Sequence, residues 1–425
     1  MEQTHAPSPG AFPGVARNPR EVLLFGLTPP RAETTPERIA EIAERTLARV
    51  EALPVDALVL YDIADEVDRN PQPRPFPFAA MLDPGDYLCQ QLHRWQRPAI
   101  IYRAVGKYGP EELSSWLATA PDNVLTVFVG SSSSDAQVRT TLTRALELHR
   151  EVRPTLPLGS VTIPERHAAR GDEHERLLTK QRAGSSFFVS QIVYDITAAK
   201  NLASDYRYAV ARADLDPAPL IFTLSLCGSG KTLSFLEWLG VEVPGWVRNE
   251  IVHAEDPLQW SKVHALNAAR ELSSFCRYLG IPFGFNIESV SSRKVEIDAA
   301  VELTHHVAEL LERDLLAWRP GPRTTTSLEP CAPNVSPIPS PTMPKGRAGG
   351  RGGVACAGST CSPGTCSPST PPARSPAPTS VASRRCSAHG PSAAPLSRSS
   401  GGWRSLTRTG GWTPFVPCGA RTRSG

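Results

Sequence analysis

Polar side chains stand at or near the ends of several dense apolar segments of the chain, and these residue types could do chemistry. Asp62 and Glu288 are carboxyls at two such positions, His167 follows the segment SVTI, and Gln191 lies inside the apolar run FFVSQIVYD. A buried amide has about four hydrogen-bonding positions to satisfy, so a purely structural role for Gln191 is costly. We therefore expect Gln191 to contact a ligand, whereas an isolated histidine such as His167 is typical of a solvated loop.

The same positions do not have the residues of a hydrolytic metal site or of a serine hydrolase site. Two histidines and a carboxylate at metal-ligand spacing are missing from these segment ends, and so is the G-x-S-x-G sequence of a nucleophile elbow. The sequence therefore predicts neither a metal site nor serine-type acyl transfer.

The segment 225–232, Ser-Leu-Cys-Gly-Ser-Gly-Lys-Thr, ends like a phosphate-binding P-loop. Ser225 stands where a P-loop needs its first glycine, and no acidic Walker-B strand follows at a suitable distance. The prediction is a turn of small residues between a strand and a helix, and not a nucleotide triphosphatase. Phosphate binding by the backbone amides of this turn stays open.

The elements that must position these residues can be derived from the apolar pattern. Short dense runs alternate with longer stretches of helical spacing from about residue 21 to 314, as in repeated strand-helix units. Near-continuous apolar runs fit parallel strands that are covered on both faces. Eight strands, each followed by a helix, predict a (β/α)8 TIM barrel, with a doubly wound sheet as the alternative. The strands are expected at 22–28, 56–62, 98–104, 123–130, 158–163, 187–195, 219–227 and 283–289.

Helix signals separate the predicted strands. Thr34 and Glu37 are candidates for a capping box at the start of the first helix. The last helix is expected over about 292–313, and the stretch 232–280 is long enough for an extra pair of helices. In this arrangement the polar residues named above lie at the C-terminal ends of barrel strands, where barrel enzymes have their active sites.

Charge divides the chain near residue 330. Residues 330–425 hold eleven Lys and Arg and no Asp or Glu, whereas the preceding residues carry 34 basic against 42 acidic side chains, a net charge of −8. The basic part also holds 16 Pro and 14 Gly without helical or strand periodicity, which predicts disorder. We expect a disordered arm over residues 1–20, the barrel over 21–320, and a disordered basic Pro/Gly/Ser/Arg-rich tail over 321–425.

Composition also favours a location and excludes some partners. The first residues, MEQTHAPSPGAFPG, do not have the pattern of a signal or transit peptide. The sequence has no run of 18 apolar residues, so no membrane-spanning helix is expected. Nine cysteines without a CxxC pair fit a reducing cytoplasm. An acidic globular part argues against nucleic acid as a partner of the barrel.

Three segments resemble the methylenetetrahydrofolate reductases in motif, order and spacing: SVTIPERH (160–167), LLTKQRAGSSFFVSQIVYD (177–195) and GVEVPGWV (240–247). The resemblance covers about residues 21–314. It implies an enzyme of one-carbon metabolism and methionine biosynthesis, a (β/α)8 barrel with FAD that reduces 5,10-methylenetetrahydrofolate to 5-methyltetrahydrofolate with a hydride from NAD(P)H. It further implies that Gln191 contacts the folate.

The resemblance also assigns residues to the flavin. His167, Glu173 and Lys180 match the family's flavin contacts after the fifth strand and on the next helix. The sequence Phe128-Val129-Gly130-Ser131, however, replaces an Arg-Gly-Asp that contacts flavin in the family. FAD is therefore expected to bind weakly or not at all, with NAD(P)H as the reductant.

The position of the presumed acid departs from the family as well. Gly26 stands where the family has a glutamate, and glycine cannot donate a proton. The protonating group is then expected from a neighbouring strand end. Asp62, after the second strand, is favoured over Glu288, beyond the eighth strand.

Three functions stay open at this point. The first is a methylenetetrahydrofolate reductase-like oxidoreductase, flavin-assisted or flavin-poor. The alternatives are a tetrahydrofolate-dependent methyl transfer or demethylation enzyme, and a barrel that binds folate without catalysis. In each, the partner is a small-molecule folate, and the sequence leaves homo-oligomerisation open.

Overall fold

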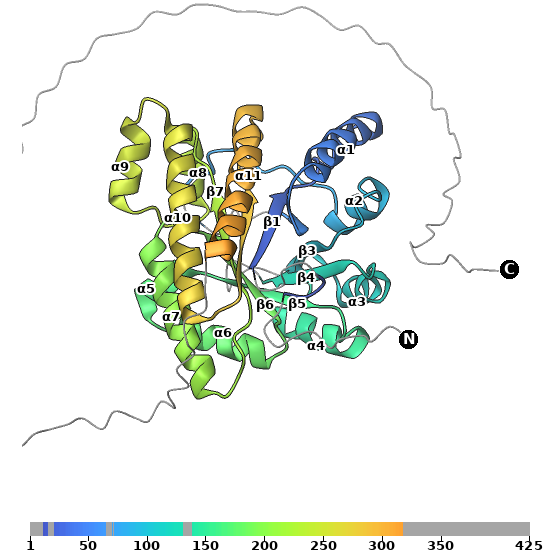
Figure 1. Ribbon diagram of the computed structural model, residues 1–425. Coiled ribbons are helices and arrows are strands. Elements are labelled where there is room, and N and C mark those ends of the chain that lie inside the picture. The colour runs from blue at the N-terminus through green and yellow to red at the C-terminus, as the bar shows by residue number, and fades with distance from the viewer. Residues whose placement is uncertain (1–11, 16–20, 65–69, 71, 131–137, 318–425) are drawn as a thin grey trace, which may run out of the picture. The chain divides into compact units, whose positions relative to one another are not determined.

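Eight parallel strands close into a barrel, in the order in which they follow one another along the chain. The computed structural model describes residues 12–15, 21–64, 70, 72–130 and 138–317, with side chains up to residue 313. The first strand also pairs with the last, with Leu24 opposite Asn286, and this pairing closes the sheet (Figure 1). The strands are β1 (Glu21–Leu27), β2 (Ala57–Leu60), β3 (Ala99–Ala104), β4 (Val124–Val129), β5 (Leu158–Thr162), β6 (Phe187–Ile192), β7 (Leu220–Ser225) and β8 (Phe283–Glu288). The predicted (β/α)8 barrel is confirmed, and the alternative of a doubly wound sheet is wrong.

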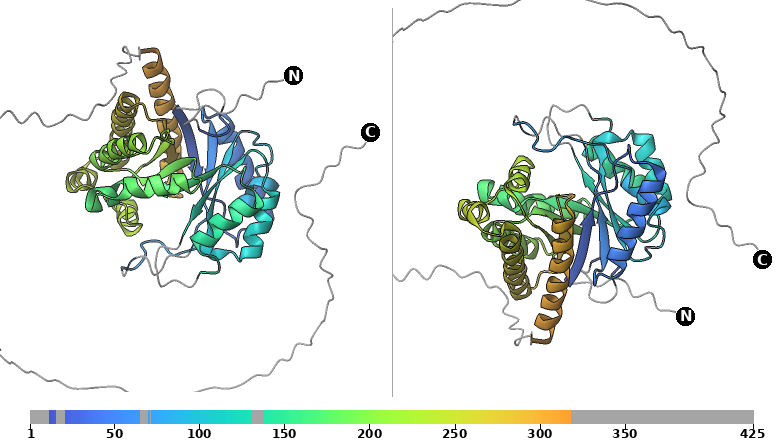
Figure 2. Two further views of the ribbon diagram at one scale, coloured as in Figure 1. Left: turned by 90° about the horizontal axis from the view of Figure 1, so that it is seen from below. Right: turned by 90° about the horizontal axis from the view of Figure 1, so that it is seen from above.

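Helices surround the strands, as the two views of Figure 2 show. The stretch for which an extra helix pair was expected, between β7 and β8, contains three helices, α8 to α10. The α-helices are α1 (Pro36–Glu51), α2 (Pro84–Gln90), α3 (Pro110–Thr119), α4 (Leu142–Val152), α5 (Pro164–Arg170), α6 (Glu173–Arg182), α7 (Ile196–Arg212), α8 (Gly230–Trp238), α9 (Gly245–His253), α10 (Pro257–Leu279) and α11 (Lys294–Ala317).

The start of α1 differs by one residue from the sequence prediction. The N-cap is Thr35, whose hydroxyl accepts a hydrogen bond from the amide of Arg38, and not Thr34. Pro36 is the first helical residue, and a proline there has no N–H for the helix to satisfy, so the capping residue must immediately precede it.

Two apolar layers hold the barrel together, because side chains alternate along each strand. On β2, Leu58 and Leu60 pack outward against the helices, whereas Ala57 and Val59 fill the interior. Phe12 joins this interior from outside the sheet. It is 1% exposed, and its ring lies 5.0 Å from that of Phe187, at the start of β6. Phe12 therefore closes the N-terminal end of the barrel.

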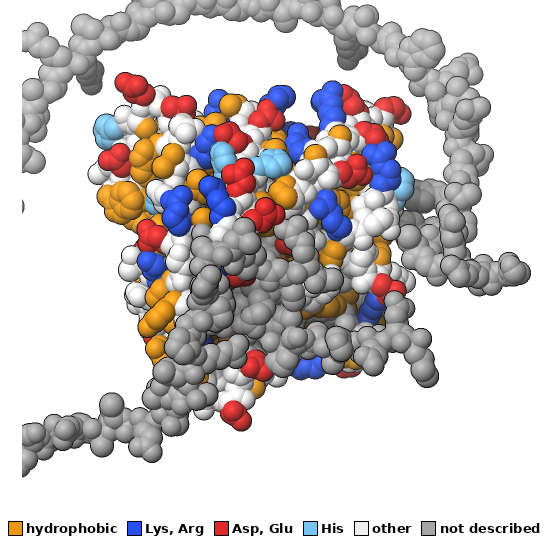
Figure 3. Space-filling view, in the orientation of Figure 1, with side chains coloured by type: hydrophobic (Ala, Val, Ile, Leu, Met, Phe, Trp, Pro, Cys, Tyr) orange, Lys and Arg blue, Asp and Glu red, His pale blue; other side chains and the backbone are white. Residues whose placement is uncertain are grey.

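The remaining predictions about chain organisation concern the ends and the surface. Within the arm predicted over residues 1–20, residues 12–15 are described and include the buried Phe12, whereas the tail over 321–425 lies outside the described residues. On the face shown in Figure 3, acidic and basic side chains are interspersed. Among the described residues, no helix has the length and apolar character to cross a membrane.

Candidate active site

The C-terminal ends of the eight parallel strands meet at one end of the barrel, called the mouth below. Glu288 is the last residue of β8, Gln191 is the last but one of β6, and Asp62 lies two residues beyond β2. The structure therefore places all three of these predicted site residues at the mouth.

Glu288 is a partly buried carboxyl that is poised to carry a proton near neutral pH. Burial raises its pKa from 4.5 to about 7, although hydrogen bonds from Tyr61 and Asn286 act in the opposite direction. The Asn286 amide, fully buried inside the barrel, donates to the Tyr61 hydroxyl over 2.7 Å and lies 3.5 Å from a Glu288 oxygen. A carboxyl with a pKa near 7 can both donate and recover a proton at physiological pH.

Gly26 of β1 lies against the base of the Glu288 side chain. A Cβ atom at residue 26 would lie 3.1 Å from the Cβ of Glu288, 3.1 Å from the Asn286 side chain and 3.0 Å from the Tyr61 ring. These distances leave no room for a side chain without displacing a neighbour. The position that the family resemblance reserves for a glutamate on the first strand is thus packed by side chains from the adjacent strands β8 and β2.

Asp62 has a different environment, because several donors already hold its carboxylate. Its side chain is 1% exposed and forms an ion pair with Lys107. The same carboxylate accepts hydrogen bonds from the backbone amide of Ala104, at 2.9 Å, and from the Tyr108 hydroxyl, at 2.8 Å. These contacts tie the end of β2 to the end of β3. Glu288 is therefore the better placed of the two predicted acids to exchange a proton.

Gln191 and Glu165 are two further polar groups at the mouth. Gln191 is partly exposed, and its amide donates to the backbone oxygen of Leu239 over 3.3 Å. Glu165, on α5, is 5% exposed, and neither of its carboxyl oxygens has a hydrogen-bond partner among the residues that the structure describes. Burial raises the pKa of Glu165 to about 7, and the negative charges of Asp195 and Glu242 also raise it. Glu165 follows a strand in the sequence, but nothing in the sequence indicates that it is buried.

Glu173 and Lys180, the residues that resemble flavin contacts on α6, are engaged within the protein. Glu173 is fully buried and accepts hydrogen bonds from the Thr162 hydroxyl, the Ile163 amide and the Arg166 guanidinium. The Lys180 ammonium donates to the backbone oxygen of Val161 over 2.6 Å, and burial lowers its pKa. Both side chains thus hold the end of β5 to α6.

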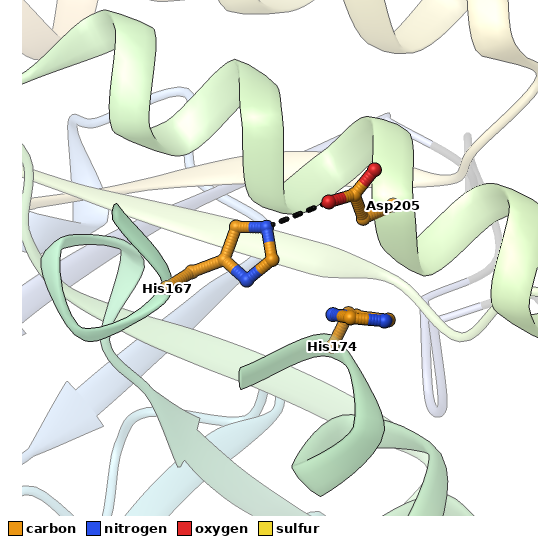
Figure 4. Close-up of side chains that lie close together, drawn as sticks. All are labelled: His167, His174 and Asp205. Carbon is orange, nitrogen blue, oxygen red and sulfur yellow. Dashed lines mark hydrogen bonds and ion pairs between the residues drawn. The ribbon is translucent and has the colours of Figure 1, made fainter. Parts of the chain in front are cut away.

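His167, the third predicted flavin contact, turns toward the outer helices. Its Nε2 atom lies 2.9 Å from a carboxylate oxygen of Asp205 on α7, and His174 of α6 lies beside both (Figure 4). Sequence reasoning missed this cluster, since its members are 7 and 31 residues apart and only the packing of three helices brings them together.

The P-loop-like turn is closed from within the protein. Ser229 caps α8 by accepting from the amide of Thr232, and the Thr232 hydroxyl lies 3.4 Å from both carboxylate oxygens of the fully buried Glu296. A Cβ atom at Gly228 would lie 3.0 Å from the Glu296 carboxyl carbon. The Glu296 side chain thus packs against this turn, which joins β7 to α8 as predicted.

The chain is similar to many proteins of known structure. No protein-family model matches the chain, and neither does any curated protein. Among solved structures, an uncharacterized protein from Clostridium thermocellum that binds two copies of 5-methyl-5,6,7,8-tetrahydrofolic acid is 39% identical, with a TM-score of 0.61. The match covers 68% of this chain and 96% of that protein.

Two other matches are more distant. The oxygenating constituent of 3,6-diketocamphane monooxygenase from Pseudomonas putida, in complex with FMN, is 9% identical, with a TM-score of 0.46 over 68% of this chain and 98% of that one. A dihydropteroate synthase from Xanthomonas albilineans is 13% identical, with a TM-score of 0.36 over 71% and 94%. At these values neither informs function. None of the three is described as a methylenetetrahydrofolate reductase, so that resemblance stays a prediction. The identity and coverage of the first match show that the chain belongs to the family of the Clostridium thermocellum protein.

Proposed function

We propose that the protein binds a reduced folate at the barrel mouth and reduces 5,10-methylenetetrahydrofolate to 5-methyltetrahydrofolate. The observation that carries the proposal is the carboxyl of Glu288, whose pKa is raised to about 7 and whose side chain packs against Gly26, the position at which the family resemblance calls for an acid. The relative from Clostridium thermocellum supports it, because that protein binds two copies of the product of this reaction.

The reaction needs one proton and one hydride. In the substrate a methylene group joins two folate nitrogens, N5 and N10. Protonation of N10 by Glu288 breaks the bond from N10 to the methylene carbon and leaves an iminium at N5. A hydride from NAD(P)H then adds to the iminium carbon, which becomes the methyl group, and NAD(P)⁺ leaves. The Glu288 carboxylate regains its proton from solvent.

Recognition of the folate is assigned to Gln191. An amide offers both a donor and an acceptor, so it can pair with the amide-like edge of a pterin ring. Within the described residues the Gln191 side chain forms one hydrogen bond, to the Leu239 oxygen, and its length lies at the longer end of the hydrogen-bond range. A ligand can replace it at small cost.

The described residues do not fit the flavin that the resemblance implies. Of the three residues matched to flavin contacts, Glu173 and Lys180 bind the end of β5, and His167 is bonded to Asp205. A flavin would need each of these contacts to be replaced. No step of the proposed reaction is therefore assigned to FAD, and the hydride is assigned to NAD(P)H.

The test is an activity assay with variants of both carboxyls. The purified protein is mixed with 5,10-methylenetetrahydrofolate and NADH or NADPH, with and without added FAD, and 5-methyltetrahydrofolate is measured. Glu288→Gln should lower turnover by about 10² or more, the usual range for loss of a general acid. The matched variant Asp62→Asn should keep more activity, and both should retain folate binding by calorimetry.

The outcomes separate the candidate functions. Equal turnover in Glu288→Gln and the parent would exclude Glu288 as the acid. Tight folate binding without reduction would refute the reductase and favour methyl transfer or a non-catalytic folate-binding barrel. Absence of folate binding would refute all three.

A further inference from the structure

Three consecutive helices bring two imidazoles and a carboxylate together in the outer layer of the barrel. His167 comes from α5, His174 from α6 and Asp205 from α7, and one ligand atom from each lies within 4.8 Å of the others. Figure 4 shows the three side chains converging from their helices. We propose that they form a binding site for a divalent metal ion of the zinc class, and this proposal does not depend on the function proposed above.

Both imidazoles have a nitrogen atom without a partner among the described residues. His167 is 5% exposed, and its Nδ1 atom is buried without a hydrogen-bond partner in this part of the chain. The same holds for the buried Nδ1 atom of His174. Burying such an atom unpaired costs about 1 to 3 kcal/mol. The two rings are neighbours, with centroids 5.2 Å apart, and an unpaired nitrogen on each points to a ligand that accepts nitrogen lone pairs.

The outer nitrogen of each ring is held by a carboxylate, as is common for metal-bound histidines. The Nε2 atom of His174 lies 3.3 Å from Glu175, and that of His167 lies 2.9 Å from Asp205. Such carboxylates fix the orientation of the ring and raise its basicity as a ligand. Asp205 gives up this outer role when it binds the metal itself: its side chain is 55% exposed and can rotate away from the His167 Nε2 atom onto the ion.

The charges around the cluster favour a cation. Two basic side chains of α5 and α6 are already paired, Arg166 with Glu173 at 3.0 Å and Arg176 with Asp172 at 3.6 Å. The two histidines themselves contact carboxylates, Glu175 of α6 and Asp205 of α7.

The spacing suits a small ion after modest adjustment. Zinc binds nitrogen at about 2.0 to 2.1 Å, so ligand atoms in a tetrahedral site are about 3.3 Å apart. Separations of up to 4.8 Å must therefore close by about 1.5 Å at most, which side-chain rotation can supply. Two imidazoles and one carboxylate suit zinc and similar first-row ions, and leave the fourth position to water. The bound ion would clamp α5, α6 and α7 together.

The test measures zinc binding to the full chain. The protein is freed of metal with a chelator, its accessible thiols are alkylated, because the sequence holds nine cysteines, and it is titrated with zinc in competition with a chromophoric chelator. The parent should bind one equivalent that His174→Ala and Asp205→Asn weaken, by about 100-fold or more for His174→Ala. The matched control is His253→Ala, an exposed histidine of α9 whose Nδ1 lies 2.8 Å from the Asn249 oxygen, and it should bind zinc like the parent.

A second measurement guards against variants that fold poorly. Zinc should raise the melting temperature of the parent and of His253→Ala but not that of His174→Ala. Equal zinc affinity in His174→Ala and His253→Ala, or a parent whose melting temperature does not respond to zinc, would overturn the proposal.

Discussion

Replacing Glu288 with glutamine should change how the stability of the protein depends on pH. Glutamine keeps the shape of the side chain and its ability to bond Tyr61 and Asn286, but it does not ionise. In the parent, burial raises the pKa of this carboxyl from 4.5 to about 7. The folded state therefore binds a proton more tightly than the unfolded state does, and ionisation of Glu288 opposes folding.

The size and direction of the effect follow from the two pKa values. The folded-state pKa is the higher one, so the favourable contribution is fully present below pH 4.5 and is lost as the pH rises through 7. Each tenfold change in proton affinity is worth about 1.4 kcal/mol, which gives a loss of about 3 kcal/mol above pH 7. Partial exposure of the side chain reduces this, so we expect about 2 to 3 kcal/mol.

The assay is urea denaturation of the parent and Glu288→Gln at pH 4.5 and pH 8. The difference in unfolding free energy should move by about 2 to 3 kcal/mol in favour of the variant between these two pH values. Comparing the two pH values cancels any constant cost of the substitution. The same change at Glu302, an exposed residue whose pKa is lowered by Lys262, should give no such gain. Parallel pH profiles for the parent and Glu288→Gln would refute the raised pKa and, with it, the proton-donor role.

Four further outcomes are expected. Gln191→Ala should weaken folate binding several-fold, as expected for about 0.5 to 1.5 kcal/mol, in calorimetry with 5-methyltetrahydrofolate, and unchanged affinity would remove Gln191 from the site. Gly26→Ala should lower stability by about 1 to 3 kcal/mol in thermal or urea unfolding, because its Cβ would crowd Tyr61 and Glu288, and an unaffected variant would mean that these neighbours move freely. Phe12→Ala should cost about 3 kcal/mol or more by the same measurement, and a negligible loss would show that Phe12 does not plug the barrel. The visible spectrum of the purified protein should lack flavin absorption, and a stoichiometric flavin band would contradict the assignment of the hydride to NAD(P)H.

The fold could be predicted closely because its signals are local. Each of the eight strands is a dense apolar run, and parallel strands covered on both faces need such runs. The start of α1 was misplaced by one residue because Thr34 and Thr35 are both suitable caps, and only the structure shows which hydroxyl accepts from Arg38. The extra pair of helices expected between β7 and β8, beyond the one helix that follows each strand, agrees with the three helices α8 to α10 found there.

The candidate site was predictable in position but not in detail. Strand order alone places Asp62, Gln191 and Glu288 at the mouth. Which carboxyl carries a raised pKa depends on contacts between distant parts of the chain. Asp62 is bound by Tyr108, 46 residues away, whereas Glu288 packs against Gly26 from the opposite end of the sequence. From the sequence, Asp62 was the preferred proton donor because the second strand adjoins the first, and no side-chain contacts can be derived from strand order.

The position of Phe12 affects the order in which ligands bind and dissociate. The Phe12 side chain packs among the interior residues at the start of the strands and closes the barrel at that end. Small molecules must therefore enter and leave by the mouth. A site that is open at one end only imposes an order on binding: the ligand that binds first is the last to dissociate. If a reductant and a folate bind one above the other at the mouth, the inner ligand cannot dissociate before the outer one. Product release is then sequential, and the dissociation rate of the outer ligand limits it.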